Sequence, residues 1–401
     1  MTKADRMVSQ TLELGRKRRI VFSLVTFLIP VVAAAGIYVA YAGYRTKGLY
    51  WYTKSNQRGW TGKVYKADAQ LGFATIPYSR GAEVFPVGDD VPARFDKDGF
   101  RVPVADKKGP STNRNAILLT IGDSFTYGAA VAAEDTYSFL VGQDLGLTSK
   151  NAGVPSYGLA QMLIVAQRLI PAHKPEYVIA QYSDWLVGRA QSAFGQTYFG
   201  KLPVPYFFVK HEGLAQYPPV FGTKIFDLPV DRYRATRRSV IDKASFLWNV
   251  GIPLFAHDDF HMSSYYVKKT LGLVPEPAAN GEELTKYVYQ AIARVAKENG
   301  AKLVIVILGN DYEPVHVPEG AFPADAIIVK AHDALIEHLL PIPDKETYEK
   351  TYFHWRGSPL QMVDPHPNER AHRIISNAIV QKIQGEAAMQ PDKRMLDPAR
   401  Q

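Results

Sequence analysis

Two short motifs hold the residue types needed for nucleophilic catalysis. Ser124 lies in GDSFTYG, and Asp364 and His366 lie together in DPHPN, about 240 residues further along the chain. A serine hydroxyl is a weak nucleophile at neutral pH until a base removes its proton, and an imidazole oriented by a carboxylate is such a base. Each motif also has a plain structural explanation. A serine in a helix-entry turn is often only a cap, and an Asp-x-His pair occurs often by chance.

The residues around Ser124 predict where its hydroxyl lies. Residues 116–121 form a short, almost purely apolar run, typical of a strand buried on both faces of a parallel sheet. The run ends at Gly122, which permits a tight turn, and Asp123, which can cap that turn with its side chain. Open α/β sheets bind their ligands at the carboxyl ends of the strands. We therefore expect Ser124 at that end of the sheet, followed by a helix from about Thr136.

The remaining chain repeats this strand-and-helix alternation. Further strands are expected to end at Gly153, at residue 182 and at residue 308, and residues 325–340 fit both the strand and the helix period. Helices are expected over residues 159–170 and 282–297, and after Asn368, a good N-cap. The glycine at position 153 either satisfies a turn or lets a backbone N–H approach a substrate, as an oxyanion hole requires.

Residues 186–280 interrupt the alternation. This stretch is rich in Pro, Gly, Tyr and Phe, with a helical pattern only near residues 240–250. We expect a large insertion at the carboxyl end of the sheet, placed to form a lid or a substrate wall. The sequence HDDFH at residues 257–261 has the composition of a metal site, and a polar loop explains it equally well.

The segment before the first core strand covers residues 45–115, and its residues 59–110 are rich in Gly, Pro and Asp. The sequence VPARFDKDGFRVPV predicts a β-hairpin that turns at residues 96–99. The D-x-D-G piece resembles a calcium loop, but Lys107 stands where the loop's final glutamate is required. We therefore expect a small β-rich lead-in, followed by a polar linker over residues 107–115.

Charge is concentrated at the N-terminus. The 401-residue chain has a net charge of +8, and the first 66 residues contribute 12 Lys or Arg against 2 Asp or Glu. The remainder carries 35 basic and 37 acidic side chains, so the basicity favours a membrane surface and not nucleic acid. The chain has no cysteine, which excludes disulfides, thiolate metal sites and a cysteine nucleophile.

Residues 20–44 contain no charged residue and exceed the roughly 20 residues that a helix needs to cross a bilayer. Four basic residues at positions 16–19 precede this stretch and favour a cytoplasmic N-terminus, although further basic residues follow it. We expect a basic tail over residues 1–19, a single transmembrane anchor over 20–44 and a loose tail over 385–401. The alternative is a signal peptide cleaved after Ala42 in Ala-Tyr-Ala, although its apolar region is longer than usual.

Taken in order, GDSFTYG, NAGVPSYG and DPHPN before a C-terminal helix resemble the SGNH (GDSL-type) hydrolase superfamily, over roughly residues 59–384. The DKDGFRVP lead-in is similar to that of bacterial periplasmic members. The resemblance implies a flavodoxin-like α/β fold, a three-layer parallel sheet between helices, over residues 116–384. It also implies that Ser124 is the nucleophile, His366 the general base and Asp364 its orienting carboxylate. Gly153 would supply an oxyanion N–H beside that of Ser124.

One motif departs from the family pattern. Members usually carry G-x-N-D after the third strand, where the Asn side chain donates to the oxyanion, whereas this chain has Asp184 at the matching place. An ionised carboxylate repels the developing charge and donates only when its pKa is raised well above neutral. Asn310, in LGND after the next strand, either supplies the missing amide or caps a turn. Losing one oxyanion donor typically costs about 10²–10³ in rate.

Two classes of function follow. The first is an esterase or acyltransferase that works through an acyl-Ser124 intermediate, without metal or cofactor, on acetyl groups of a cell-envelope or exported polysaccharide. It would act from the periplasmic face of a bacterial inner membrane, with the acylated carbohydrate or another ester as its partner and no nucleic acid. The second is a non-catalytic binding or assembly subunit on a degenerate SGNH scaffold. The intact Ser, His and Asp favour the first class, and the missing asparagine favours the second.

Overall fold

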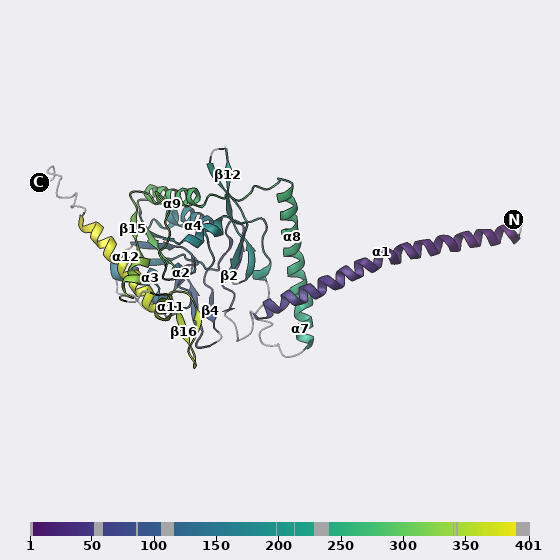
Figure 1. Cartoon of the computed structure of the whole chain (residues 1–401), viewed down its shortest axis with the longest axis horizontal. Coiled ribbons are helices and arrows are strands. Elements are labelled where there is room, and N and C mark those ends of the chain that lie inside the picture. The colour runs from purple at the N-terminus through teal and green to yellow at the C-terminus, as the bar shows by residue number, and fades with distance from the viewer. Residues whose placement is uncertain are drawn as a thin grey trace.

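The computed structural model describes residues 3–51, 59–85, 87–105, 116–197, 199–211, 213–227, 240–339, 341 and 344–389. Figure 1 shows an α/β body from which one long helix, α1 (Lys3–Trp51), projects. The expected linker over residues 107–115 and most of the expected C-terminal tail lie outside the described residues.

A parallel sheet forms the centre of the body. Its five parallel strands lie in the order β8-β7-β9-β14-β15. In chain order this is 2-1-3-4-5, the flavodoxin-like doubly wound order, so the predicted fold class is confirmed. The strands are β7 (Ile117–Ile121), β8 (Thr148–Asn151), β9 (Tyr177–Tyr182), β14 (Lys302–Ile307) and β15 (Ile327–Val329).

Both faces of this sheet are covered, which explains its apolar strands. Along β7, Leu119 and Ile121 join one buried cluster and Leu118 joins the other, because successive side chains point to opposite faces. The first face packs against α4 (Leu159–His173), α5 (Asp184–Ala190) and α9 (Gly281–Glu298). The second packs against α3 (Tyr137–Leu145), α10 (Ala331–Glu337) and α12 (Glu369–Met389).

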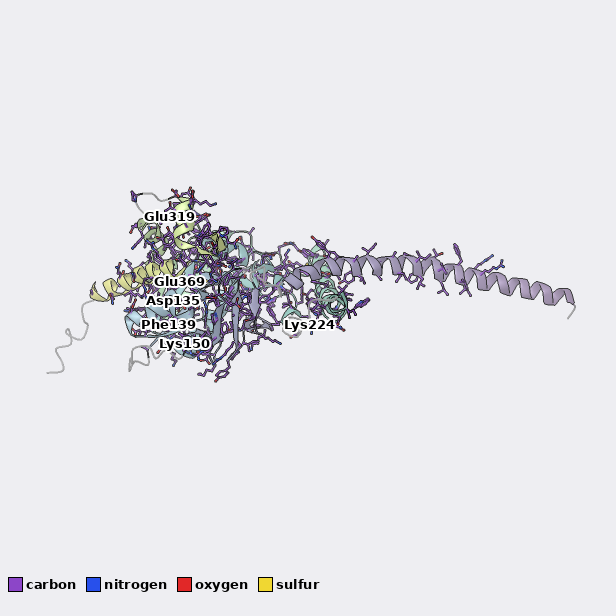
Figure 2. All side chains as sticks on the ribbon, turned by 90° about the horizontal axis from the view of Figure 1, so that it is seen from below. Asp135, Phe139, Lys150, Lys224, Glu319 and Glu369 are labelled. Carbon is purple, nitrogen blue, oxygen red and sulfur yellow. The ribbon has the colours of Figure 1, made fainter. Side chains whose placement is uncertain are left out.

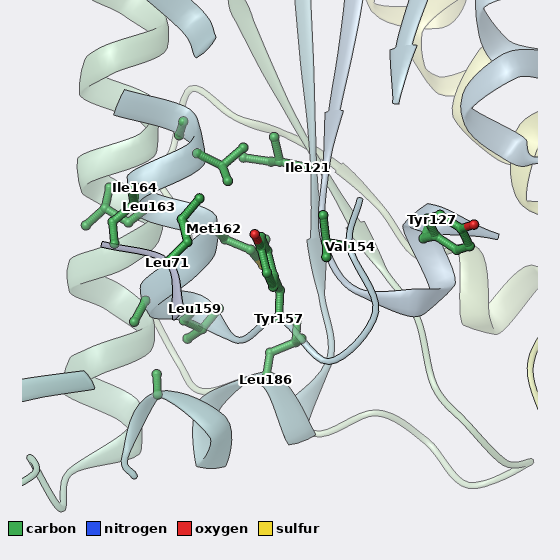
Figure 3. Close-up of a cluster of buried hydrophobic side chains, with 14 of the residues drawn as sticks. Leu71, Ile121, Tyr127, Val154, Tyr157, Leu159, Met162, Leu163, Ile164 and Leu186 are labelled. Carbon is green, nitrogen blue, oxygen red and sulfur yellow. The ribbon is translucent and has the colours of Figure 1, made fainter. Parts of the chain in front are cut away.

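Figure 3 shows the first of these cores beside the strand that carries the serine. Tyr157 lies between Val154 and Met162, and it is 1% exposed. Its hydroxyl donates to the Phe73 carbonyl oxygen at 2.6 Å, so the lead-in is joined to the core by a polar contact as well as an apolar one.

The lead-in extends the central sheet. The expected hairpin around residues 96–99 is present, because Phe95 of β5 pairs with Arg101 of β6. Arg101 then pairs with Asn151 of β8, so the antiparallel strands β1-β4-β5-β6 continue the nine-stranded sheet beyond β8. The bounds are β1 (Gly59–Thr61), β4 (Arg80–Val84), β5 (Val91–Phe95) and β6 (Arg101–Val102), with a separate hairpin of β2 (Tyr65–Asp68) and β3 (Gly72–Thr75).

The insertion after β9 begins with α5 and contains two small hairpins and a helical rod. The hairpins are β10 (Phe194–Thr197) with β11 (Gly200–Pro203) and β12 (Tyr206–Lys210) with β13 (Gly213–Tyr217), followed by a 3-10 turn, η2 (Ile225–Asp227). The rod consists of α7 (Val240–Phe246), a π-helical turn, η3 (Leu247–Gly251), and α8 (Ile252–Thr270). Residues 257–261 lie within α8, so the polar loop expected there is wrong.

The ambiguous stretch over residues 325–340 holds both kinds of element, the edge strand β15 and then α10. After it come α11 (Lys345–Tyr352) and a hairpin of β16 (His354–Arg356) and β17 (Gln361–Asp364). Strand β17 ends at Asp364, so the hairpin leads directly into the second sequence motif.

Candidate active site

Ser124 is the first residue of a one-turn helix, α2 (Ser124–Tyr127), directly after β7. Asp123 caps this helix, as expected, because its Oδ1 accepts a hydrogen bond from the Phe125 N–H at 2.9 Å. Gly128 ends it in the left-handed region at φ 79°, which favours glycine. Short α2 therefore presents Ser124 at the carboxyl end of the sheet before the longer helix α3 begins. The expected cap of α3, Thr136, accepts from the Phe139 N–H.

The two sequence motifs meet in a continuous hydrogen-bonded chain. Ser124 Oγ lies 2.8 Å from His366 Nε2, and His366 Nδ1 lies 2.6 Å from Asp364 Oδ1. Asp364 Oδ1 also accepts from the His366 backbone N–H at 2.9 Å, which fixes the turn. With Nδ1–H donated to the carboxylate, Nε2 is the acceptor for the Ser124 hydroxyl proton. This is the arrangement in which a serine hydroxyl becomes a nucleophile.

The turn that carries His366 is held from both sides. The Asn368 side chain caps α12 by accepting from the Ala371 N–H at 3.1 Å, and its amide donates to the Thr351 carbonyl oxygen at 2.9 Å. The Phe125 ring packs edge-on against the His366 ring, with centroids 5.3 Å apart. The imidazole is therefore oriented by the backbone and by packing as well as by its carboxylate.

Sequence reasoning found Asp123 only as a cap, and the structure gives it two further partners. Its Oδ2 accepts from Trp185 Nε1 and from Arg189 Nη1, each at 2.8 Å, and the side chain is fully buried. Arg189 also donates to the Tyr157 carbonyl oxygen at 2.8 Å. These partners lie more than 60 residues away on α5, and no local sequence signal pairs them with Asp123.

A second network joins three strand ends behind the serine. Gln181 Oε1 accepts from the Asp123 N–H at 3.0 Å and from Thr126 Oγ1 at 2.8 Å. Gln181 Nε2 donates to Ser183 Oγ, which in turn donates to the Leu308 carbonyl oxygen at 2.8 Å. The carboxyl ends of β7, β9 and β14 are thus joined by side chains, which makes the serine turn rigid.

The lead-in supports the far end of α2 through Arg101. Its guanidinium donates to the carbonyl oxygens of Tyr127, Gly128 and Val131, and it lies 4.1 Å from the centroid of the Tyr127 ring. Arg101 is 4% exposed, so these contacts satisfy a buried charge. The nine-stranded sheet therefore positions the nucleophile from its antiparallel side as well.

Gly153 lies beside α2, where a Cβ atom would overlap the backbone nitrogen of Tyr127. Its N–H donates to Asn151 Oδ1 at 2.9 Å, and the Asn151 amide donates to the Thr126 carbonyl oxygen at 2.8 Å. The glycine is thus explained by close backbone approach, and its N–H is already bonded within the chain. The Ser124 N–H, by contrast, has no acceptor within the part of the chain that the structure describes.

The two other oxyanion candidates lie at neighbouring strand ends. Asp184 is exposed at the start of α5, where its Oδ1 accepts from the Trp185 N–H at 2.7 Å. Asn310 is exposed after β14. Strand β9 lies next to β7, and β14 lies one strand further, so Asp184 is one strand spacing from the serine strand and Asn310 is two.

No protein-family model matches the chain, and no curated protein matches it. Among solved structures it is similar to an acetylxylan esterase from Geobacillus stearothermophilus, with 12% identity, 67% of this chain and 94% of that one covered, and a TM-score of 0.32. It is also similar to LAE5, an α/β hydrolase from the metagenome of Lake Arreo in Spain, with 13% identity, coverage of 67% and 95%, and a TM-score of 0.34. A third is TesA, with 10% identity, coverage of 67% and 98%, and a TM-score of 0.31.

The insertion reaches the serine turn through α5, whose Arg189 contacts Asp123. Its hairpin of β12 and β13 packs at the start of α4, where the Gln216 side chain donates to the Ala160 carbonyl oxygen at 2.8 Å. Its 3-10 turn η2 packs against the lead-in, where Phe226 contacts Phe73. Within the described residues, its hydrogen bonds do not include Ser124. The lid remains a prediction.

A buried histidine behind the site makes stability depend on pH. His372 of α12 accepts from the Tyr137 N–H and stacks on that ring, and burial lowers the pKa of its imidazole to about 3. The unfolded chain binds this proton below roughly pH 6.5, whereas the folded chain excludes it. The contribution of His372 to stability is therefore expected to be fully present above that pH and to fall by about 1.4 kcal/mol per pH unit as the pH drops toward 3.

We predict that His372→Asn, which keeps an acceptor for Tyr137, flattens this acid dependence. Unfolding free energies measured between pH 7 and pH 4 test it, with His338→Asn, a change at an exposed histidine, as the matched control. A variant whose stability falls with acid as steeply as that of the wild type would contradict the assignment.

Proposed function

We propose that the chain is an SGNH-type serine esterase or acyltransferase. The observation that carries the proposal is the hydrogen-bonded chain from Ser124 Oγ through His366 to Asp364. A stable α/β fold requires neither a hydrogen bond between a serine and a histidine at the end of a strand nor a carboxylate bonded to the other ring nitrogen of that histidine. Together these contacts supply what acyl transfer requires, namely a nucleophile, its base and the group that orients the base.

In the proposed reaction, Ser124 Oγ attacks the carbonyl carbon of an ester while His366 Nε2 takes the hydroxyl proton. The imidazolium is stabilised by Asp364 and then gives its proton to the leaving alcohol as the tetrahedral intermediate collapses. This leaves an acyl-Ser124 ester. Water activated by His366 releases the acid, or a sugar hydroxyl takes the acyl group in the same way.

The oxyanion is proposed to bind at the Ser124 N–H, with Gly153 and a strand-end side chain as further donors. Two observations weaken this part of the site. The Gly153 N–H is bonded to Asn151, and a carboxylate, Asp184, stands where the related enzymes have an amide. They favour the second candidate function, a binding or assembly subunit without catalysis.

Asp184→Asn tests whether the chain is an enzyme whose oxyanion site is weakened by Asp184 or a binding subunit without catalysis. If Asp184 lies at the oxyanion position, an amide there donates to the developing charge, and kcat should rise by up to about 10²-fold with little change in KM. The test is hydrolysis of p-nitrophenyl acetate. Asp311→Asn, the same change after the neighbouring strand β14, is the matched control and should leave the rate unaltered. An unchanged rate in both variants would remove Asp184 from the oxyanion site.

We further propose that the substrate is an O-acetyl group, or another small acyl group, on a cell-envelope or exported polysaccharide. We also propose that α1 anchors the enzyme in a bacterial inner membrane, with the catalytic domain in the periplasm. Residues Arg18–Tyr44 of α1 are long and apolar enough to cross a bilayer, as are the residues of a signal sequence. Figure 2 shows that most of this part of α1 projects away from the body, and the described side chains up to Ile37 are exposed. Residues of α1 also contact the insertion, and these contacts fix the position of the insertion relative to the proposed anchor.

A further inference from the structure

From Tyr38 onward one side of α1 is covered, while Tyr41 and Tyr44 remain exposed. The described side chains from Arg18 to Ile37 are all exposed, and Ile37 is 71% exposed. Tyr38 is half-buried and Ala42 is fully buried. Residues 20–37 rise by about 27 Å as a helix, close to the roughly 30 Å thickness of a bilayer's hydrocarbon core. A hydrocarbon-spanning segment that starts at Ile20 therefore ends where the protein begins to cover α1, although the apolar stretch continues to Tyr44.

The segment that covers α1 at this point is the insertion rod, residues 240–270. Tyr38 OH donates to Asp259 Oδ2 of α8 at 3.5 Å. Gly43 faces Leu247 in the π-helical turn, since a Cβ atom there would lie 3.8 Å from Leu247 Cδ2. Figure 1 shows α8 lying across α1, between the body and the projecting part of α1. The rod therefore packs against α1 directly after the residues of α1 that are fully exposed.

The rod has two chemically different sides. Toward the body it buries Leu254, Phe255 and Tyr265. The opposite side carries apolar residues at helical spacings of four and seven, which we call the apolar stripe: Ala256, Phe260, Val267 and Leu271. Phe260, Val267 and Leu271 are 70%, 58% and 65% exposed.

Trp248, at the π-helical turn, is 61% exposed. Tryptophan is enriched where a protein surface meets the headgroups of a bilayer. The stripe lies on the side of α8 opposite the buried Leu254, Phe255 and Tyr265. Figure 1 shows the projecting part of α1 extending away from α8 on the side opposite the body. A helix that exposes one apolar side in the plane of a membrane surface is typical of interfacial attachment.

We propose that the apolar stripe of α8, with Trp248, lies in the headgroup region of the bilayer that α1 crosses. The proposal rests on the membrane anchoring proposed above and not on the ester chemistry. A single transmembrane helix leaves a domain free to tilt and rotate about it. A second attachment, across the axis of the first, fixes the orientation of the whole sheet, including the Ser124 end, relative to the membrane.

The test uses the full-length chain, which has no cysteine, so that every single-cysteine variant carries one label. Phe260→Cys and Val267→Cys are labelled with a nitroxide and reconstituted into vesicles of phosphatidylethanolamine and phosphatidylglycerol. Collisions with oxygen, which concentrates in lipid, are compared with collisions with a water-soluble nickel chelate. Three further variants provide references: Ile29→Cys in the expected span, Lys268→Cys one residue from the stripe and about 100° around α8, and Glu298→Cys on α9.

We expect the ratio of oxygen to nickel collisions at positions 260 and 267 to exceed that at Lys268 and Glu298 severalfold and to fall below that at Ile29. Ratios at 260 and 267 equal to that at Glu298, with Ile29 in lipid, would overturn the proposal. Exclusion of both reagents, with spin–spin broadening, would overturn it in favour of a second copy of the chain. A water-exposed Ile29 would overturn it together with the anchor, whereas ester hydrolysis, measured separately, would stand.

Discussion

Replacing Ser124 by alanine is expected to lower kcat for p-nitrophenyl acetate by at least about 10³-fold, and His366→Ala is expected to do the same. The reason is the 2.8 Å contact between Ser124 Oγ and His366 Nε2. Without the base the hydroxyl keeps its proton, and without the hydroxyl the base has nothing to activate. The double variant should lose little more than either single variant, because residues that act as a unit are not additive.

Asp364→Asn is expected to cost less than either change, because Ser124 and His366 both remain, but the amide can donate to Nδ1 and hold the imidazole in the wrong tautomer. Ser138→Ala is a suitable control, since Ser138 is a buried serine on α3 that bonds to Thr120 and Ser149 and not to a histidine. Steady-state rates with all variants folded, as shown by circular dichroism, provide the measurement. Additive losses in the double variant would show that Ser124 and His366 do not work together.

The second large effect is expected at Asp123, which combines a helix cap with a buried ion pair. Asp123→Ala removes the acceptor for the Phe125 N–H, the Trp185 indole and the Arg189 guanidinium at once. Loss of the cap costs about 1 kcal/mol, and groups left without their charged partner cost more. We expect the free energy of unfolding to fall by about 2–4 kcal/mol, and activity to fall with it because Ser124 starts the capped helix.

Asp123→Asn separates the two contributions. The amide oxygen still caps α2, whereas the charge opposite Arg189 is lost, so its cost should lie between zero and that of alanine. Arg189→Met, alone and with Asp123→Asn, completes a double-mutant cycle for the ion pair. Denaturant unfolding of each variant gives the free energies. Equal stability of Asp123→Ala and wild type would mean that the serine turn does not depend on this network.

The parts of the fold that sequence could predict are those set by local chemistry. The apolar run before Gly122, the helix after Asn368 and the hairpin around residues 96–99 each carry their own signal in neighbouring residues, and each is present. A parallel sheet is predicted in the same way, whereas its flavodoxin-like strand order is implied only by the family resemblance. Once apolar strands alternate with amphipathic helices, the parallel sheet follows, because both of its faces must be covered.

The parts that sequence could not predict depend on contacts between distant segments. The lead-in continues the central sheet because Arg101 pairs with Asn151, and backbone pairing of this kind leaves no pattern in side-chain types. The sequence around Arg189 predicts only an arginine on the surface of a helix, and its ion pair with Asp123 forms only in the folded chain. Residues 257–261 are polar enough to suggest a loop, yet they lie in α8, because packing of Leu254, Phe255 and Tyr265 against the body outweighs local propensity.

The central claim is that the proton of Ser124 is taken by His366, and covalent labelling tests it most directly. The full-length protein is treated with a fluorophosphonate, which reacts only with activated serines, and the modified peptide is identified by mass spectrometry. We predict one adduct, on Ser124, that forms rapidly in the wild type and is lost or greatly slowed in His366→Ala. Absence of an adduct on Ser124, or labelling at the same rate without His366, would contradict the catalytic account and leave the scaffold function in its place.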